Sequence, residues 1–338
     1  MAESSSDQHR ADKASGLKPK YNRCSSSVRG SPLSDLLFSI VIACYNQEVF
    51  VRQSVESALS QTYQSKEVIV VDDASKDGTS EVLRSFGDAI VFVGLTVNGG
   101  ACAARNCGAS YARGRYLVFL DGDDVLAPWA LEVYSRLVDA HKPKIILGRS
   151  AVCYSQIPDT SQMNAPHEIR CVKYPNFLSK DRPWIYNSSA LVVERAAFNA
   201  SGGWTPEIFY QDIQDLLSKL GTAGTTNLIL APDTVSYRMH ASNATWNCHL
   251  FVKGIYTLLA KAKADMYPGG REYAAKRAAW FGGIVFYWMK EAFKSGNYRG
   301  GLHLLTTKWW LILLAAVRRA KAWIVGRKPV ETLSLARD

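Results

Sequence analysis

Three aspartates follow a short apolar run near the middle of the chain. Residues 116–120 predict a buried strand, and directly after it come Asp121, Gly122, Asp123 and Asp124. Carboxylates this close together raise each other's pKa, because each disfavours the charge of the other. A hard cation such as Mg²⁺ or Mn²⁺ removes that cost by taking carboxylate oxygens as ligands. The sequence therefore indicates a metal site, the alternative being an acidic turn that Asp and Gly favour for local reasons.

Predicted strands and helices alternate along the first half of the chain. The apolar runs that predict strands are 38–44, 68–71, 90–93, 116–120 and 145–147. Helical patterns occupy 51–61, a segment opening at 77–81, 101–109 and the segment after Pro128. The alternation predicts an α/β fold with a doubly wound, mostly parallel, Rossmann-like sheet. Ligands of such sheets lie at the carboxyl ends of the strands, where this chain has Tyr45, Asp72, Asp73, Asn98, Arg105, Asp121, Asp123 and Asp124.

The loop after the first strand argues against the commonest nucleotide-binding proteins of this class. It has the sequence Tyr45-Asn46-Gln47, without the GxGxxG glycines that let a helix approach a dinucleotide pyrophosphate. The chain also lacks a GxxxxGK(S/T) motif. We therefore set aside a dehydrogenase and a P-loop ATPase. A nucleotidyltransferase also uses paired aspartates, but it would normally carry a glycine-rich basic loop at this place.

Four motifs, in order along the chain, resemble a known enzyme family. They are residues 39–46, 70–79, 98–106 and 119–124. The set resembles the inverting glycosyltransferases of family 2, which have the GT-A fold, and extends over about a third of the chain. The likeness continues more loosely through 202–204 and 237–240 to about residue 245. It implies a GT-A-type sheet with a nucleotide-sugar half to about residue 150 and an acceptor half after it.

The resemblance implies a binding site for a nucleotide-sugar donor. Tyr45 would pack on the base, Asp73 would accept a hydrogen bond from the base ring, typically uracil, and Arg105 would face the nucleotide or its phosphates. An equal alternative for Asp72 is a carboxylate that caps a helix or forms a turn. The implied donor-binding residues are Tyr45, Asn46, Asp72, Asp73, Asn98, Arg105, Asp121 and Gly122.

The resemblance also implies a metal centre. Asp121 and Asp123 match the DxD motif of the family, with Asp123 the direct ligand, and His240 would complete the site. Imidazole suits Mn²⁺ better than Mg²⁺. The ion, Mn²⁺ or Mg²⁺, would bridge the two phosphates as a Lewis acid and offset the charge on the leaving nucleotide. Asp124 would cap the turn before Pro128 or contact the ribose.

An inverting transfer needs a base for the acceptor hydroxyl. The family places this carboxylate at the start of a helix after the Gly-Gly-Trp segment, 202–204 here. Asp212 aligns best and Asp215 is the rival, because Gln211 stands where Glu is commoner and the second acid is shifted. Both could instead be first-turn acids that interact with the helix dipole. Trp204 could stack on a sugar ring or pack internally.

Composition divides the chain into three parts. Residues 1–34 are polar and predict a disordered arm, 35–245 form the glycosyltransferase domain, and 246–338 form a helical region. The net charge of +10 indicates an anionic partner. Because no nucleic-acid-binding motif is present, we assign the basic residues to phosphate and lipid. Seven cysteines without a CxxC pair indicate reduced thiols in a cytosolic protein.

The last predicted helix, 298–327, has the composition of a membrane-surface helix. Its unbroken apolar run, 309–317, is too short to span a bilayer. Tryptophans beside arginines and lysines fit a helix lying in an anionic interface. The alternative is a helix that packs on the catalytic domain or forms a homo-oligomer.

Together these features predict a metal-dependent inverting glycosyltransferase. It would move a sugar, most simply from a UDP-sugar, to a hydroxyl of a lipid-linked or polysaccharide acceptor in cell-surface glycan synthesis. We expect it in the cytoplasm, peripheral on the inner face of the cell membrane. The alternative is a catalytically inactive nucleotide-sugar-binding or scaffold protein of the same fold.

Overall fold

The computed structural model describes residues 37–154, 166–182, 187–208, 210–240, 243 and 248–335. The arm predicted at 1–34 and the boundary predicted between 245 and 246 lie outside these ranges.

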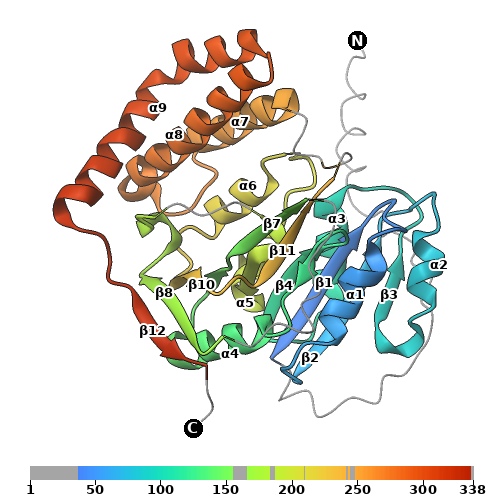
Figure 1. Ribbon diagram of the computed structural model, residues 1–338. Helices are drawn as coiled ribbons and strands as arrows, with labels where there is room; N and C mark the ends of the chain where they lie inside the picture. Colours follow the sequence, from blue (N-terminus) through green and yellow to red (C-terminus); the bar gives the residue numbers. More distant parts are fainter. Residues whose placement is uncertain are drawn as a thin grey trace, which may run out of the picture.

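A nine-stranded sheet with the order β12-β8-β10-β6-β9-β4-β1-β2-β3 forms the centre of the protein (Figure 1). Its parallel part consists of β1 (Phe38–Cys44), β2 (Lys66–Asp72), β3 (Val91–Gly94) and β4 (Tyr116–Asp121). Every residue of β1 is buried, as expected of a strand covered on both faces. The predicted α/β sheet is confirmed.

The other half of the sheet is mixed. It contains β6 (Ile145–Leu147), β8 (Glu168–Tyr174), β9 (Leu191–Glu194), β10 (Thr226–Ala231) and β12 (Glu331–Ser334). β9 runs antiparallel between β4 and β6, so the strand predicted at 145–147 does not pair with β4. A smaller sheet consists of β5 (Val125–Leu126), β11 (Val235–Met239) and β7 (Ser150–Tyr154).

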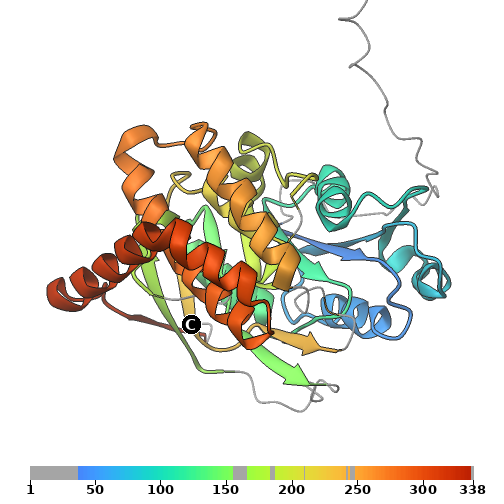
Figure 2. The same cartoon turned by 90° about the horizontal axis from the view of Figure 1, so that it is seen from above.

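The helices before the C-terminal region pack around the central sheet. They are α1 (Val51–Leu59), α2 (Thr79–Arg84), α3 (Ala101–Tyr111), α4 (Ala130–His141), α5 (Arg195–Ala200) and α6 (Asp212–Lys219), with short 3₁₀ turns η1 (Gly87–Ala89), η3 (Phe177–Ser179) and η4 (Ser188–Ala190). Figure 2 shows α3 on one face of β1 and α1 on the other. α3 packs closely because Gly108 lies against β1, where a Cβ would collide with Val41 and approach Val71 to 3.2 Å.

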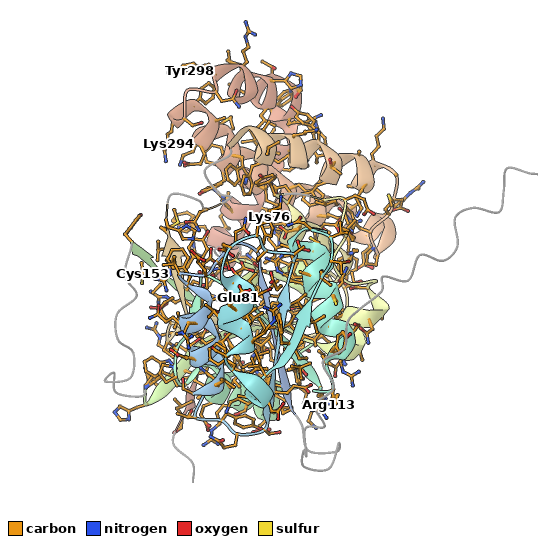
Figure 3. All side chains as sticks on the ribbon, turned by 90° about the vertical axis from the view of Figure 1, so that its right-hand side faces the viewer. Lys76, Glu81, Arg113, Cys153, Lys294 and Tyr298 are labelled. Atoms are coloured by element: carbon orange, nitrogen blue, oxygen red, sulfur yellow. The ribbon has the colours of Figure 1, made fainter. Side chains whose placement is uncertain are left out.

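The C-terminal helices α7 (Cys248–Lys263), α8 (Gly270–Lys294) and α9 (Tyr298–Val325) stack beside α6 at the upper left of Figure 1. α8 and α9 form an antiparallel hairpin. The chain then returns to the sheet as β12, which pairs antiparallel with β8. β12 is the edge strand of the sheet and was not predicted. In Figure 3, Lys76, after the carboxyl end of β2, lies on the side of these helices, whereas Arg113, before β4, lies at the opposite end.

Candidate active site

The parallel strands bring their carboxyl ends to one rim, as predicted. In the strand register Ala43 of β1 lies beside Asp121, and Cys44 lies beside Asp72. Gly122 fits between the acids because it has no side chain. A Cβ there would lie 2.6 Å from the Cβ of Cys44 and would also meet the side chain of Gln47.

Three predicted donor-binding residues lie on loops at this rim. Tyr45 is 40% exposed and Asn98 is exposed. The backbone N–H of Asn46 donates to the Ser75 hydroxyl at 2.9 Å, and its Oδ1 accepts from the N–H of Lys76 at 2.8 Å. Asn46 therefore joins the loops that follow β1 and β2.

Asp72 and Asp73 hold the loops around them. The buried carboxylate of Asp72 accepts the N–H of Ser75 at 3.0 Å and the hydroxyl of Ser80, which is the turn-forming arrangement. Asp73 accepts the N–H groups of Gly99 at 2.8 Å and Gly100 at 2.7 Å, at the N-terminus of α3. Gly100 has a φ of +83°, a conformation that favours glycine.

Arg105 is buried at the centre of the rim. It donates to Oδ1 of Asp121 at 2.7 Å, to Oδ2 of Asp212 at 2.8 Å and to the Ser188 hydroxyl at 2.9 Å. Burial opposes its charge, but the two aspartates outweigh burial and raise the pKa of Arg105 above its ordinary value. The structure thus places Arg105 as a bridge between the DxD segment and the start of α6.

Trp204 packs beneath this arginine. Its ring is 1% exposed, lies 5.2 Å edge-on from Phe119 and lies 4.8 Å from the Arg105 guanidinium. The Asn106 side-chain amide donates to the backbone carbonyl of Trp204 at 2.8 Å and accepts from the backbone N–H of Trp204 at 2.9 Å. Of the two possibilities left open by the sequence, the structure shows internal packing.

Two of the three predicted metal ligands, Asp123 and His240, lie in direct contact. Their Oδ2 and Nε2 atoms are 2.9 Å apart, and the His240 ring stacks on Phe50 at 4.7 Å. Burial and the nearby Asp121 raise the pKa of Asp123, while His240 opposes the shift. Because burial and Asp121 disfavour the charge of Asp123, a divalent cation bound there would stabilise the ionised carboxylate. The neighbouring imidazole is a suitable ligand for Mn²⁺.

Asp121 does not join that pair directly. Its two carboxylate oxygens accept from Arg105 and from the Ser188 hydroxyl, the latter at 2.7 Å. Among the described ranges, the one group of three donor side chains within 4.8 Å of one another is His141, Cys171 and Glu331, at the β8–β12 edge and apart from the rim.

Asp124 is fully buried. It accepts the Ser189 hydroxyl at 2.5 Å and the backbone N–H of Arg238 at 2.9 Å. Burial, together with Asp123 and Asp121, raises its pKa well above the ordinary value. Neither Ser188 nor Ser189 was predicted to contact the acids, because neither belongs to the motifs that carry the family resemblance.

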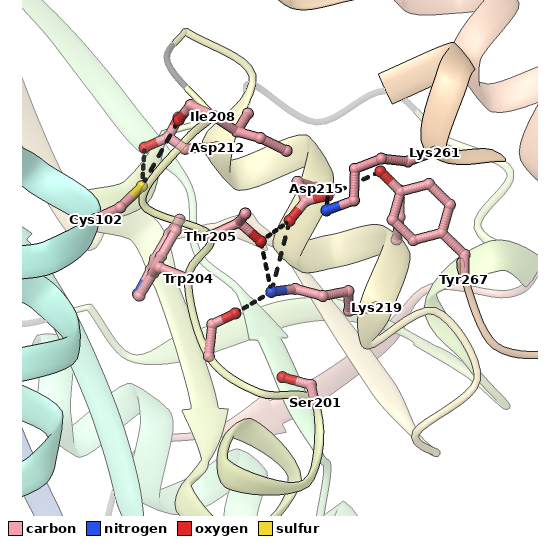
Figure 4. Close-up of polar contacts among 12 residues, drawn as sticks. Cys102, Ser201, Trp204, Thr205, Ile208, Asp212, Asp215, Lys219, Lys261 and Tyr267 are labelled. Carbon is pink, nitrogen blue, oxygen red and sulfur yellow. Dashed lines mark hydrogen bonds and ion pairs between the residues drawn. The ribbon is translucent and has the colours of Figure 1, made fainter. Parts of the chain in front are cut away.

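The two candidate bases differ in their surroundings (Figure 4). Asp212 starts α6, is 24% exposed at its side chain and contacts Arg105, with the Cys102 sulfur at 3.8 Å. Asp215 is fully buried and accepts from Thr205 at 2.6 Å and from the Tyr267 hydroxyl at 2.8 Å.

The network around Asp215 is a charged one. Lys261 of α7 and Lys219 of α6 both pair with its carboxylate. Burial opposes ionisation, but Lys261, with hydrogen bonds from Thr205 and Tyr267, outweighs burial and lowers the pKa of Asp215. Asp215 therefore fastens α6 to the C-terminal helices. Gln211 adds a second link by donating to the carbonyl of Phe251 at 3.3 Å.

Comparison with known proteins identifies relatives of this arrangement. The model of the family "Glycosyl transferase family 2" matches residues 39–199. An uncharacterised glycosyltransferase of Rickettsia prowazekii is 34% identical over 146 residues, which are 43% of each chain.

Two further similarities cover more of the chain. The Escherichia coli protein WfaP, a UDP-Glc:alpha-D-GlcNAc-diphosphoundecaprenol beta-1,3-glucosyltransferase, is 32% identical over 218 residues, 62% of this chain and 80% of WfaP. The S. aureus TarS structure with UDP-GlcNAc superimposes with a TM-score of 0.64 over 81% of each chain. At 16% identity this last similarity shows the fold alone.

Proposed function

Since the chain belongs to glycosyltransferase family 2 and is an inverting glycosyltransferase, we propose that it transfers a sugar from a UDP-sugar to a hydroxyl of a lipid-linked glycan. The name of the E. coli relative supports both halves of this proposal, since it specifies a UDP-sugar donor and a diphosphoundecaprenol-linked acceptor. We propose that the enzyme acts on this acceptor at the cytoplasmic face of the membrane.

The structural observation that carries the transfer reaction is the bridge made by Arg105. It holds Asp212 at 2.8 Å and Asp121 at 2.7 Å from one guanidinium, so the candidate base and the DxD segment share one rigid support. The planar fork of arginine suits such a bridge, because its donors point in fixed directions.

In this proposal Asp212 takes the proton of the acceptor hydroxyl as its oxygen attacks the anomeric carbon. Arg105 fixes the orientation of the Asp212 carboxylate throughout. Asp215, which is fully buried and paired with two lysines, has a supporting role in positioning α6. Tyr45 and Asn98, exposed at the same rim, bind the nucleotide of the donor.

Asp123 and His240 would hold the divalent ion, Mn²⁺ or Mg²⁺. When bound, the ion supplies Lewis-acid stabilisation of the leaving diphosphate. Asp121 supports the site through Arg105 and Ser188.

The test is nucleotide release from UDP-, GDP- and dTDP-sugars with Mn²⁺, Mg²⁺ or EDTA, with the lipid-linked acceptor present. We expect Asp212→Asn to lower turnover by about 10²–10⁴-fold while donor binding is retained, because an amide cannot take the proton of the acceptor hydroxyl but can still accept the hydrogen bond of Arg105. Asp123→Ala should lose the metal-dependent activity. Asp88→Asn, the same chemical change at an exposed position of η1, is the control and should match wild type.

Full turnover by Asp212→Asn would exclude this residue as the base. Absence of turnover with every donor, combined with no metal-dependent nucleotide binding, would favour the inactive scaffold instead.

A further inference from the structure

Helix α9 packs on α8 through one face. The residues of this face are Gly301, Leu304, Leu311 and Ala315, all buried. Their spacing of three, seven and four residues keeps them on one side of a helix. The approach is close, because a Cβ on Gly282 of α8 would lie 2.5 Å from the carbonyl carbon of Leu311.

The opposite face of α9 is apolar and exposed. We call it the α9 apolar face and define it by Leu302, Leu305, Trp309, Leu313 and Val317. At 100° per residue Leu302, Trp309, Leu313 and Val317 lie across the helix from the centre of the buried set, and Leu305 lies at the border between the two faces. Trp309 is 58% exposed and Leu313 is 53% exposed, which is a large amount of apolar surface to leave in water.

The charge on α9 has a single sign. Tyr298–Val325 contains Arg299, Lys308, Arg318, Arg319 and Lys321 and no aspartate or glutamate. Arg299 lies in the first turn and Lys321 near the last, both exposed, and Arg327 and Lys328 follow the helix. Cations therefore flank the apolar face at both ends.

We propose that the α9 apolar face lies in the interface of an anionic bilayer. Aliphatic side chains and Trp309 enter the boundary between headgroups and acyl chains, where an indole ring has both apolar and polar partners. Arg299 and Lys321 contact the anionic headgroups. The charges favour an anionic bilayer over a neutral one, because only anionic headgroups are attracted to the cations at the two ends of the face.

In this proposal α9 lies on the bilayer and does not cross it. The run 309–317 is too short to span, but the whole helix Tyr298–Val325 is long and apolar enough to cross by length and composition, so length alone does not exclude a crossing. A crossing helix has its ends on opposite sides of a membrane. Here both ends are fixed to the same body. The N-terminal end follows α8 after a turn, and near the C-terminal end Arg318 donates to the carbonyls of Leu178 at 2.6 Å and Lys180 at 2.7 Å. β12 then pairs with β8 in the central sheet.

A second copy of the chain fits the face less well. In a symmetric dimer the same surface meets itself, so the cations of one α9 would face those of the other. With no acid on the helix, nothing on α9 would compensate that repulsion.

The placement matters for the reaction, a point that rests on the proposed function. α7 packs on α8 and contacts α6 through Lys261–Asp215 and Gln211–Phe251. Docking of α9 therefore brings the helix that starts at Asp212 to a fixed place beside the membrane, where a lipid-linked acceptor is found.

The experiment is flotation of the full chain with vesicles of phosphatidylcholine, with and without phosphatidylglycerol. Wild type should float with the anionic vesicles and much less with neutral ones. Trp309→Glu/Leu313→Glu should bind at least roughly 25-fold more weakly, at about fivefold per charge. Arg299→Gln/Lys321→Gln should show a similar loss on anionic vesicles alone. Both pairs are exposed, and circular dichroism should confirm their folding.

The matched control is Ser85→Glu/Ala89→Glu, which adds the same charge at exposed positions near α2, far from α9 in Figures 1 and 2. It should float nearly as wild type does, and so should Asp212→Asn, because docking does not depend on turnover. Wild type that remains unbound, or an acidic α9 variant that still floats, would overturn the proposal. Vesicle binding that persists in high salt and is unaffected by Arg299→Gln/Lys321→Gln would also overturn the proposal, because this is the behaviour of a helix that crosses the bilayer. Self-association abolished by Trp309→Glu/Leu313→Glu without vesicle binding would assign the face to a second copy instead.

Discussion

At the scale of single residues, the contacts of Arg105 are ones that no other side chain can reproduce. It is buried, carries a charge and uses its two terminal nitrogens for three oxygen partners on different segments. A lysine would retain the charge but not the flat, two-pronged geometry.

We therefore predict that Arg105→Lys separates charge from geometry. The variant should lose about 1–3 kcal/mol of unfolding free energy, since hydrogen bonds to charged groups are lost. Turnover should fall at least about tenfold, because Asp212 loses its orientation. Urea unfolding and nucleotide release measure the two effects. Arg113→Lys, at a partly exposed pair with Glu67, is the control, and an Arg105→Lys variant as active as Arg113→Lys would remove Arg105 from the support of the base.

At the scale of elements, adjacent glycines of α8 have opposite surroundings. A Cβ on Gly282 would collide with the Leu311 carbonyl group of α9, whereas a Cβ on Gly283 would have its nearest neighbour, the end of Arg319, at 3.7 Å. We therefore expect the hairpin to depend on the first glycine and to tolerate replacement of the second.

Gly282→Ala should lower the unfolding free energy by about 1–3 kcal/mol, because α9 must move away from α8. Gly283→Ala should be neutral or stabilising by up to about 1 kcal/mol, because alanine is the better helix former. Denaturant midpoints of the two variants give the comparison. Equal effects would show that α8 and α9 do not pack as closely as described.

At the scale of the whole molecule, Asp215 joins the catalytic part to the C-terminal helices by charge. Its pKa is lowered, so the unfolded chain binds the proton more strongly than the folded one. Stability from this group is therefore present above the ordinary pKa of about 4 and is lost as pH falls through the lower, folded value.

Asp215→Asn should cost about 3–5 kcal/mol at pH 7, since it leaves Lys261 buried without its partner charge. The difference from wild type should shrink as the pH is lowered below about 4. Guanidinium unfolding at several pH values measures this, with the exposed Asp139→Asn as control. A difference that stays constant with pH would show that Asp215 is not charged in the folded protein.

The sequence predicts the parallel half of the fold well because the signals there are local. The strands β1 and β4 are mostly apolar, and α3 follows a glycine pair, so their limits are visible within a few residues. β12 carries no such signal. It is four residues long, with exposed and half-buried positions alternating at a sheet edge, and its partner β8 lies far away in the sequence.

For the site, too, the sequence predicts one part and not the other. Motifs predict which residues lie at the rim, because strand ends in a parallel sheet share one edge. They do not predict that Arg105 faces Asp212, or that Ser188 bridges Arg105 and Asp121. Those contacts join residues about a hundred positions apart or come from a 3₁₀ turn without a motif, so only tertiary structure defines them.

The return of the chain from α9 into the sheet through β12 has a mechanical consequence. A helix fastened at both ends cannot swing, so an enzyme resting on α9 would hold its reaction centre at one fixed height above the bilayer. The distance between the reaction centre and the bilayer would then select acceptors by their length. An acceptor whose terminal hydroxyl is carried too near the lipid, or too far from it, would be missed even with the right sugar, and the number of sugars already attached would decide when this enzyme acts.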